Sequence, residues 1–258
     1  SSGRMGRALL EAVLQGADTE LGGALEVVDS PSLGKNAGEM IGVTSDVLVS
    51  ADIDVAIAGC SALIDFTRPE GTLAHVAYCA AHGIKMIIGT TGFDEKGEAR
   101  LAAAARHAVI VKSGNMSMGV NLLAALAERA AKALADYDIE ILEMHHRNKV
   151  DAPSGTALLL GEAAARGREV SLNKHAVKTR DGHTGARKDG DIGFATLRGG
   201  SVVGEHSVIF AGTGERITLS HSAEDRSIFS HGALTAAKWG HGKKPGLYSM
   251  TDVLGLNA

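Results

Sequence analysis

Short apolar runs alternate with helical segments through the first half of the chain, and this alternation constrains the fold more than any other feature. The runs that predict strands are Leu21–Val28, Ala62–Phe66, Lys85–Ile88 and Ala108–Val111. The segments with helical periodicity are Met5–Gln15, Glu70–His82 (which follows Pro69) and Asp94–His107. Strands that alternate with helices of about 10–15 residues form βαβ units, whose strands lie parallel. We therefore predict an α/β fold that opens with a parallel sheet.

The pattern changes in the second half of the chain. Helices are predicted over Val120–Leu134, about 155–165 and Ile228–Trp239, and strands over Ile139–Met144, Ile192–Leu197, Ser207–Ala211 and Arg216–His221. Strands grouped in this way predict a mixed or antiparallel sheet with helices on one face, which makes the second domain an α+β domain. We place the boundary near residue 115, so that residues 1–115 and 116–225 belong to different domains.

The composition excludes several classes of protein. A net charge of −4 argues against a nucleic-acid binder, which usually carries a basic domain. No apolar run approaches the ~20 residues needed to cross a bilayer. Cys60 and Cys79 lack the spacing of metal ligands, so we interpret them as reduced, buried thiols. These features predict a cytoplasmic protein without a metal, a membrane partner or a nucleic-acid partner.

The chain opens with a glycine turn that is typical of dinucleotide-binding proteins. Gly3 and Gly6 flank Arg4 and Met5 immediately before the first helix. Glycines at this spacing let the backbone approach a pyrophosphate, and the N-terminus of the helix offers it N–H groups. Glu26 follows Gly6 by about 20 residues, where an acidic side chain binds the adenosine ribose. The first domain is therefore predicted to be a Rossmann-type, nucleotide-binding domain.

A glycine turn of this kind normally follows a buried strand, and none precedes Ser1. That strand would be central in the sheet, between the strands that begin at Leu21 and Ala62. We therefore expect the natural chain to carry roughly 8–15 more residues upstream, a β-branched strand and another glycine among them.

Residues 143–157, with the sequence EMHHRNKVDAPSGTA, form the most informative segment. His145, His146 and Lys149 bring side chains suited to proton transfer close together. Pro153 predicts the start of a helix, whose first N–H groups at Ser154, Gly155 and Thr156 would point outward unpaired. Cationic side chains that face a helix N-terminus predict a site for a carboxylate or a phosphate.

The same segment resembles the signature of the 4-hydroxy-tetrahydrodipicolinate reductases of bacterial lysine and diaminopimelate biosynthesis. The resemblance extends over nearly the whole chain. Further matching pieces are GRMG at 3–6, DFT at 65–67, GTTGF at 89–93, NMSMGVN at 115–121, GHTG at 182–185, IGFA at 192–195, VGEH at 203–206 and GLY at 246–248.

The resemblance implies an NAD(P)H-dependent oxidoreductase that delivers hydride to a small dicarboxylate. It implies that His145 is the proton donor, that Lys149 assists it, and that the substrate is bound by His146, Ser154, Gly155 and Thr156. Cofactor-binding residues would be Gly3, Arg4, Met5, Gly6, Glu26, Gly89, Thr90, Thr91, Ser113, Gly114, Asn115 and Met116. It also implies that residues 226–258 complete the nucleotide domain and that the second domain forms a homotetramer, with the loop around Gly182–Gly190 as part of the contact.

One position departs from the family pattern. Many relatives carry an arginine after the acidic residue, where it meets the 2′-phosphate of NADP, but this chain has Val27. Glu26 would repel that phosphate, so the sequence favours NADH over NADPH, although Arg4 or Lys35 could replace the missing arginine.

Two other functions remain open at the level of sequence. Another two-domain dehydrogenase, of the aspartate or homoserine type, could share this architecture, but the paired histidines argue against it. A nucleotide-sensing protein without catalysis would keep the glycine turn and would have no need for histidines beside an anion site.

Overall fold

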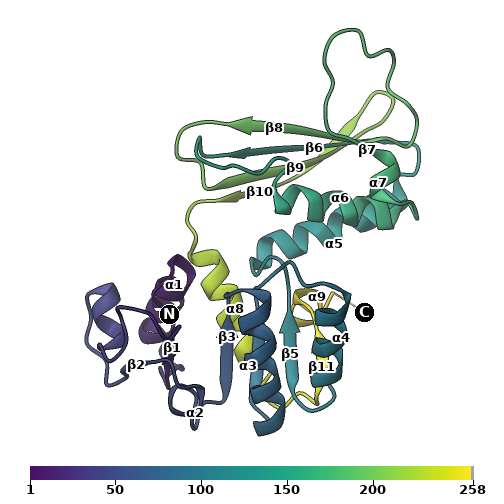
Figure 1. Cartoon of the computed structure of the whole chain (residues 1–258). Coiled ribbons are helices and arrows are strands. Elements are labelled where there is room, and N and C mark those ends of the chain that lie inside the picture. The colour runs from purple at the N-terminus through teal and green to yellow at the C-terminus, as the bar shows by residue number, and fades with distance from the viewer. Residues whose placement is uncertain (257–258) are drawn as a thin grey trace. The chain divides into compact units, whose positions relative to one another are not determined.

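A computed structural model describes residues 1–256 and divides the chain into two compact units (Figure 1). Unit 1 contains Ser1–Ser117 and the segment that starts at Ser227, and unit 2 contains Met118–Arg226. Among the described residues, no helix has both the length and the apolar character that a membrane span requires.

Unit 1 contains a four-stranded parallel sheet in the order β11-β5-β4-β3. Its strands are β3 (Ala62–Asp65), β4 (Lys85–Ile88), β5 (Val109–Lys112) and β11 (Gly246–Tyr248). The predicted strands in this region are confirmed to within a residue at each end, and the α/β fold is confirmed with them. β11 pairs with β5, so the last part of the chain returns to the sheet of unit 1.

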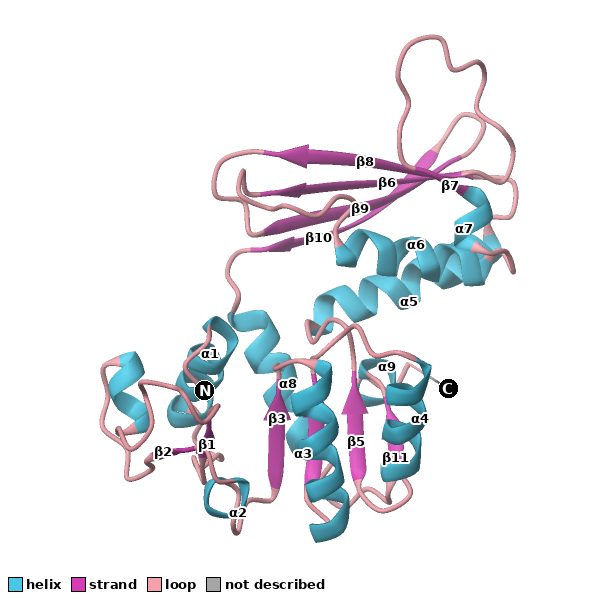
Figure 2. Cartoon of the chain, viewed as in Figure 1, coloured by secondary structure: helices cyan, strands magenta, loops and turns pink. Residues whose placement is uncertain are grey.

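Helices cover both faces of this sheet (Figure 2). Met86 and Ile88 of β4 pack against α3 (Pro69–His82) and α4 (Glu95–Ala104), whereas the intervening Ile87 packs against α8 (Ser227–Trp239). This alternation is what a strand buried on both faces requires. The other elements of unit 1 are α1 (Arg4–Gln15), the 3₁₀ helix η1 (Ala37–Ile41), α2 (Ile53–Ala56) and α9 (Met250–Val253).

A separate two-stranded parallel sheet joins β1 (Ala24–Leu25) to β2 (Val49–Ser50). The strand predicted over Leu21–Val28 is therefore much shorter than expected. Gly23 explains part of the difference, because a Cβ there would lie 1.4 Å from the Ala56 carbonyl oxygen and the backbones approach too closely for regular pairing. β1 and β3 share no hydrogen-bonded ladder.

Unit 2 is a five-stranded mixed sheet in the order β10-β9-β6-β8-β7, with its helices on one face (Figure 2). β6 (Asp138–His145) runs parallel to β8 (Ile192–Arg198) and antiparallel to β9 (Gly204–Ala211), which pairs with β10 (Arg216–Ala223). The remaining elements are α5 (Met118–Ala133), α6 (Gly155–Gly167), α7 (Leu172–His175) and β7 (Ala176–Val177). The predicted α+β arrangement is confirmed.

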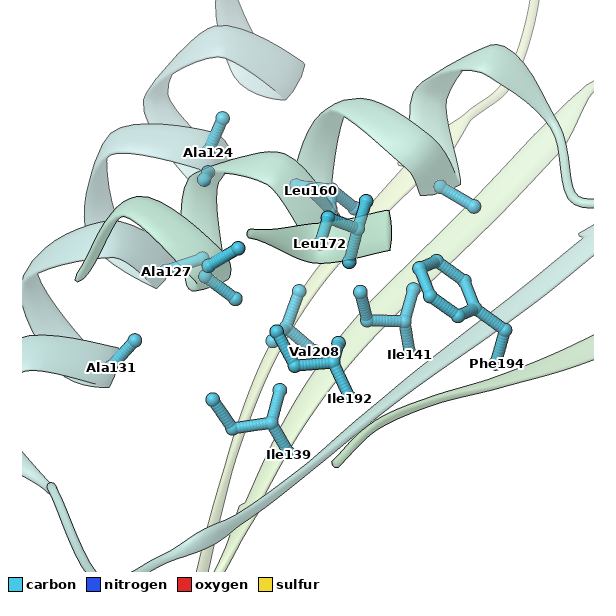
Figure 3. Close-up of a cluster of buried hydrophobic side chains, with 14 of the residues drawn as sticks. Ala124, Ala127, Ala131, Ile139, Ile141, Leu160, Leu172, Ile192, Phe194 and Val208 are labelled. Carbon is cyan, nitrogen blue, oxygen red and sulfur yellow. The ribbon is translucent and has the colours of Figure 1, made fainter. Parts of the chain in front are cut away.

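The core of unit 2 lies between this sheet and the helices α5 and α6 (Figure 3). Ile139 and Ile141 of β6 meet Phe194 of β8 there, below Leu160 of α6. Gly161 lets the Phe194 ring approach, because a Cβ on that helix position would lie 2.6 Å from the ring. The packing fixes which face of each strand points toward α6, and the candidate site depends on that face.

Candidate active site

One face of the unit 2 sheet changes from apolar to polar along β6, β8 and β9. In β6 the buried residues alternate as Ile139, Ile141, Glu143 and His145. Because alternate residues of a strand point to the same face, Glu143 and His145 continue the row that forms the core. The neighbouring strands repeat the change, with His206 next to Val208 and Phe210 on β9 and with Thr196 and Arg198 after Phe194 on β8.

Glu143 is the centre of this polar cluster and is 1% exposed. Its Oε1 atom accepts hydrogen bonds from the Ser154 backbone N–H (3.0 Å), Arg198 Nη2 (3.0 Å) and Thr196 Oγ1 (3.3 Å). Its Oε2 atom contacts Arg198 Nη1 (3.1 Å) and His145 Nδ1. Burial raises the pKa of Glu143, but the donors outweigh burial and hold the pKa below its usual range. The carboxylate therefore stays charged.

His145 lies at the end of β6, 8% exposed, with its Nδ1 atom against Glu143. Burial lowers the pKa of His145, Glu143 raises it, and Lys149 and Arg198 lower it, so that the net shift is downward. No described residue forms a hydrogen bond with its Nε2 atom. A Cβ at Gly204 would lie 3.1 Å from that nitrogen, so the glycine leaves Nε2 accessible.

His206 stands edge-on to His145, with the ring centroids 5.0 Å apart. Its Nε2 atom lies 3.2 Å from Ser154 Oγ, and its buried Nδ1 atom has no hydrogen-bond partner among the described residues. Burial lowers the pKa of His206 to about 4. The ring is therefore neutral near pH 7 and cannot supply a proton there.

Glu143, His145 and His206 have ligand atoms within 4.8 Å of one another, a spacing that a metal ion could accept. Arg198, however, places a guanidinium on the same carboxylate. A cation would have to displace that charge, and we assign the cluster no metal.

The N-terminus of α6 differs from the expectation at Ser154. Pro153 lies outside the helix, which begins at Gly155 with Ser154 as its N-cap, and Ser154 Oγ accepts the Ala157 N–H. The Ser154 N–H is not unpaired as predicted, because it donates to Glu143. Ser154 is 1% exposed and supports the site from inside.

The other sequence-predicted residues of this segment lie near the same end of the sheet. Gly155 is exposed, with open space where a Cβ would be, and Thr156 follows it in the first turn of α6. His146 Nε2 lies 3.4 Å from Arg226 Nη2. Lys149 Nζ forms an ion pair with Asp151 at 2.8 and 3.0 Å. The segment therefore presents two histidines, a lysine and a helix N-terminus.

The glycine turn of unit 1 precedes α1, whose N-cap is Gly3 and whose first turn contains Arg4, Met5 and Gly6. No side chain caps this helix, so its first N–H groups are left for another acceptor. A Cβ at Gly6 would lie 2.0 Å from the Ser1 carbonyl oxygen, so this position admits only glycine. Glu26 follows β1 directly and accepts the Ser2 N–H, which places the carboxylate beside the turn.

The remaining predicted residues follow β4 and β5 at the carboxyl ends of these strands. Thr91 and Gly114 are exposed there and adjacent, since a Cβ at Gly114 would lie 3.5 Å from Thr91 Cγ2. Ser113 Oγ donates to the Asn115 carbonyl oxygen at 2.6 Å and so shapes the second loop. Gly89 is required by packing, because a Cβ there would lie 2.2 Å from the Phe66 ring.

Two side chains of these loops point inward, contrary to a role in contacting a cofactor. The Thr90 hydroxyl donates to buried Asp65 at 3.2 Å and accepts from Thr72 at 2.9 Å. Met116 is 0% exposed and packs in the core beside α8. Thr90 and Met116 could therefore contribute to a binding surface through their backbone atoms and not through their side chains.

Sequence reasoning missed four residues of the polar cluster, namely Glu143, Thr196, Arg198 and His206. A signal for Glu143 was present, because it precedes His145 by two positions in a strand and must share its face. Arg198 and His206 gave no such signal, since only the strand register brings them to Glu143.

Comparison with known proteins places both halves of the chain in one family. The family model for the N-terminus of dihydrodipicolinate reductase matches residues 1–116, and the model for the C-terminus matches residues 119–254. The chain belongs to the dihydrodipicolinate reductase family. The sequence resemblance is thereby confirmed.

Relatives of this family match the chain over its full length. The 4-hydroxy-tetrahydrodipicolinate reductase 1 of Mesorhizobium japonicum is 60% identical over 100% of this chain and 95% of its own. The 4-hydroxy-tetrahydrodipicolinate reductase of Brucella abortus is 58% identical over 100% and 97%. A solved structure of dipicolinate-bound dihydrodipicolinate reductase from Paenisporosarcina sp. TG-14 aligns with a TM-score of 0.77 and 25% identity, covering 97% of this chain and 95% of that one.

Proposed function

We propose that this chain is an NAD(P)H-dependent 4-hydroxy-tetrahydrodipicolinate reductase that forms tetrahydrodipicolinate in lysine and diaminopimelate biosynthesis. The observation that supports this most directly is the end of β6, where His145 is oriented by a buried carboxylate beside the exposed N-terminus of α6. Full-length relatives that are 58–60% identical carry the name of the same enzyme.

His145 is the general acid in this proposal. Loss of the 4-hydroxyl group from the substrate as water leaves a conjugated cyclic imine, which is the species that is reduced. As this ring is reduced, negative charge develops on a ring carbon, and a proton on His145 Nε2 neutralises it. The Nε2–H bond breaks, the proton passes to that carbon, and a neutral imidazole with its proton on Nδ1 remains. A lowered pKa makes His145 a stronger acid, which favours transfer once the ring is protonated. Lys149 lies four residues further along and assists as a second cation.

Gly155 and Thr156 bind a substrate carboxylate at the start of α6, and His146 contributes a second polar contact. The macrodipole and the N–H groups of a helix N-terminus favour an anion. The relative from Paenisporosarcina was solved with dipicolinate, a small dicarboxylate. Fixing both carboxylates would orient the ring and make proton transfer effectively intramolecular.

Unit 1 fits a dinucleotide, which would supply the hydride when bound. The uncapped start of α1 suits the pyrophosphate, and Glu26 suits the ribose hydroxyls. The nicotinamide would face the loops that follow β4 and β5. The residues concerned are Thr91, Ser113, Gly114, Asn115 and, through their backbones, Gly89, Thr90 and Met116. We favour NADH over NADPH, because Val27 is 69% exposed beside Glu26 and offers no positive charge to a 2′-phosphate.

We further propose a cytoplasmic homotetramer that assembles through unit 2. The sheet of that unit is covered by helices on one face, and Leu197 on the other face is 47% exposed. Size-exclusion chromatography with light scattering would distinguish a tetramer from a monomer.

An assay with purified protein tests the function. Substrate made by the preceding synthase should cause oxidation of NADH or NADPH, followed by the loss of nicotinamide absorbance, and substrates of aspartate and homoserine dehydrogenases should cause none. His145→Gln should lower kcat by roughly 10²–10⁴-fold with little change in KM. His107→Gln, at an exposed position of unit 1, is the control. Absence of substrate-dependent oxidation would refute the function, and an unimpaired His145→Gln would refute only the acid assignment.

A further inference from the structure

Glu143 is a buried carboxylate in direct contact with the proposed proton donor. Every group that its two oxygens meet is a hydrogen-bond donor, namely the Ser154 N–H, both terminal nitrogens of Arg198, the Thr196 hydroxyl and His145 Nδ1. These donors come from β6, β8 and the start of α6. Glu143 therefore connects the catalytic strand with two neighbouring elements.

Only a carboxylate satisfies this set of donors. An ionised carboxylate is an acceptor at both oxygens, whereas the amide of glutamine has one acceptor atom and one donor group. Glutamine at position 143 would turn its NH₂ group toward Arg198 and His145, or toward the Ser154 N–H. An unsatisfied buried donor costs about 1–3 kcal/mol, so the isosteric change is not neutral.

The charge on Glu143 also decides which nitrogen of His145 titrates. An acceptor-only partner requires that Nδ1 carry its hydrogen in both protonation states of the ring. The second proton then binds and leaves at Nε2, the nitrogen beside Gly204 that forms no hydrogen bond with a described residue. The hydrogen bond thus fixes the tautomer, the ring orientation and the reactive atom together.

We propose that Glu143 is the positioning residue of His145, and that Arg198 holds Glu143 in place for this purpose. The proposal rests on the proposed function, in which His145 gives its Nε2 proton to the substrate. Glu143 touches neither substrate nor cofactor in this scheme and acts only through the imidazole.

Arg198 has a second contact that fits this role. Its Nη2 atom donates to the Asp151 carbonyl oxygen at 2.8 Å, while both terminal nitrogens hold Glu143. The bidentate geometry of a guanidinium and a carboxylate restricts the carboxylate plane. Arg198 therefore fixes the direction in which Glu143 meets His145 and ties the loop of Lys149 to the same point.

The charged groups around His145 shift its pKa in opposite directions. Glu143 from β6 favours the imidazolium, whereas Arg198 from β8 and Lys149 from the following loop oppose it. His206 from β9 is neutral near pH 7, with His221 of β10 behind it. Removal of Glu143 should therefore lower the pKa of His145.

The test is a titration of His145 by ¹H–¹⁵N NMR in the full chain, with kcat and KM measured on the same samples. In Glu143→Gln the pKa of His145 should fall by roughly 1–3 units, because the opposite charge is lost. Its kcat near neutral pH should fall by about 10²–10⁴-fold, as for loss of the acid itself, while KM changes little. In Arg198→Gln the Nδ1-protonated tautomer of His145 should become less populated, because Glu143 is no longer held in place.

Glu140→Gln is the matched control. Glu140 lies three residues earlier on β6, points to the opposite face, and forms ion pairs with Arg180 (2.8 Å) and Arg187 (3.1 Å). Glu140→Gln removes a comparable ion pair. It should leave the pKa and the tautomer of His145 unchanged, and the kcat of the protein as well.

Two results would overturn the proposal. One is a Glu143→Gln protein in which the His145 pKa and tautomer match the wild type. The other, decisive if Glu143→Gln does not fold, is an Arg198→Gln protein in which the Nδ1-protonated tautomer of His145 is as populated as in the wild type. The titration needs no substrate. A wild-type protein without reductase activity would therefore refute the proposed function and leave the positioning result to be judged separately.

Discussion

His206 should make unit 2 lose stability as the pH falls from neutral to about 5, by an amount that its burial sets. An unfolded histidine titrates near 6.5, whereas burial lowers the pKa of folded His206 to about 4. Between these two pKa values, His206 is protonated in the unfolded chain and neutral in the folded protein. The free energy of unfolding therefore decreases as the pH falls through this range. At ~1.4 kcal/mol per unit, the loss from about pH 7.5 to 5 is roughly 2 kcal/mol.

The pH range from about 7.5 to 5 separates the contribution of His206 to stability from the contributions of the acidic groups. Glu143 and Asp65 have lowered pKa values, so their stabilising contribution is complete above about pH 5 and is lost only in stronger acid. His145 and His221 also have lowered pKa values and destabilise in the same direction as His206. Comparison with His206→Gln isolates the contribution of His206, because the other groups remain in the variant.

Urea unfolding at about pH 7.5 and 5 measures this effect. Two units need not unfold in one transition, so two probes are required. Far-UV circular dichroism follows both units, whereas Trp239, the only tryptophan, lies in α8 and reports unit 1. The unit 2 transition should lose about 2 kcal/mol more in the wild type than in His206→Gln. Equal losses in the two proteins would refute the reasoning that burial keeps His206 neutral.

Three further predictions concern binding and packing. Val27→Arg should improve the use of NADPH relative to NADH, since a guanidinium matches phosphate geometry; measured kcat/KM ratios equal to those of the adjacent control Val28→Arg would show that the 2′-phosphate is recognised elsewhere. Pyridine-2,6-dicarboxylate should inhibit competitively and a monocarboxylate analogue much more weakly, and steady-state inhibition of equal strength would remove the two-point anion site. Gly89→Ala should destabilise unit 1 by about 1–3 kcal/mol through its clash with Phe66. The control is Gly114→Ala, at an exposed position where a Cβ would make only an ordinary contact of 3.5 Å with Thr91 Cγ2, and it should leave the Trp239 transition unchanged.

The regular elements were predictable where periodicity was long enough to decide their type. Lys85–Ile88 has the predicted bounds, and the helix predicted after Pro69 includes that proline as its first residue. The two-residue strand β2 and the short 3₁₀ helix η1 gave no signal, because neither contains a helical repeat or an apolar run long enough to recognise. Their positions depend on contacts from distant parts of the chain.

The sequence motif of the candidate site was predictable, whereas the residues from other strands that hold His145 and Glu143 in place were not. The proposed proton donor and the proposed anion-binding turn lie in one continuous segment, so local rules suffice to find them. The same rules gave the wrong result for the Ser154 N–H, because a buried carboxylate 11 residues away accepts it. Arg198 is 55 residues from Glu143, and only the pairing of β6 with β8 brings the two together.

The return of the chain to unit 1 sets an order of events during synthesis on the ribosome. Unit 2 is continuous from Met118 to Arg226 and is complete when Arg226 has emerged. Unit 1 at that moment still lacks α8, which covers one face of its sheet, and β11, which pairs with β5. Domains fold as units while translation proceeds. The N-terminal part of unit 1 is synthesised first but cannot complete its fold until α8 and β11 are made, and until then one edge of its sheet is unpaired and one apolar face is uncovered. Unit 1, rather than unit 2, is therefore the part whose apolar surface stays exposed longer during synthesis.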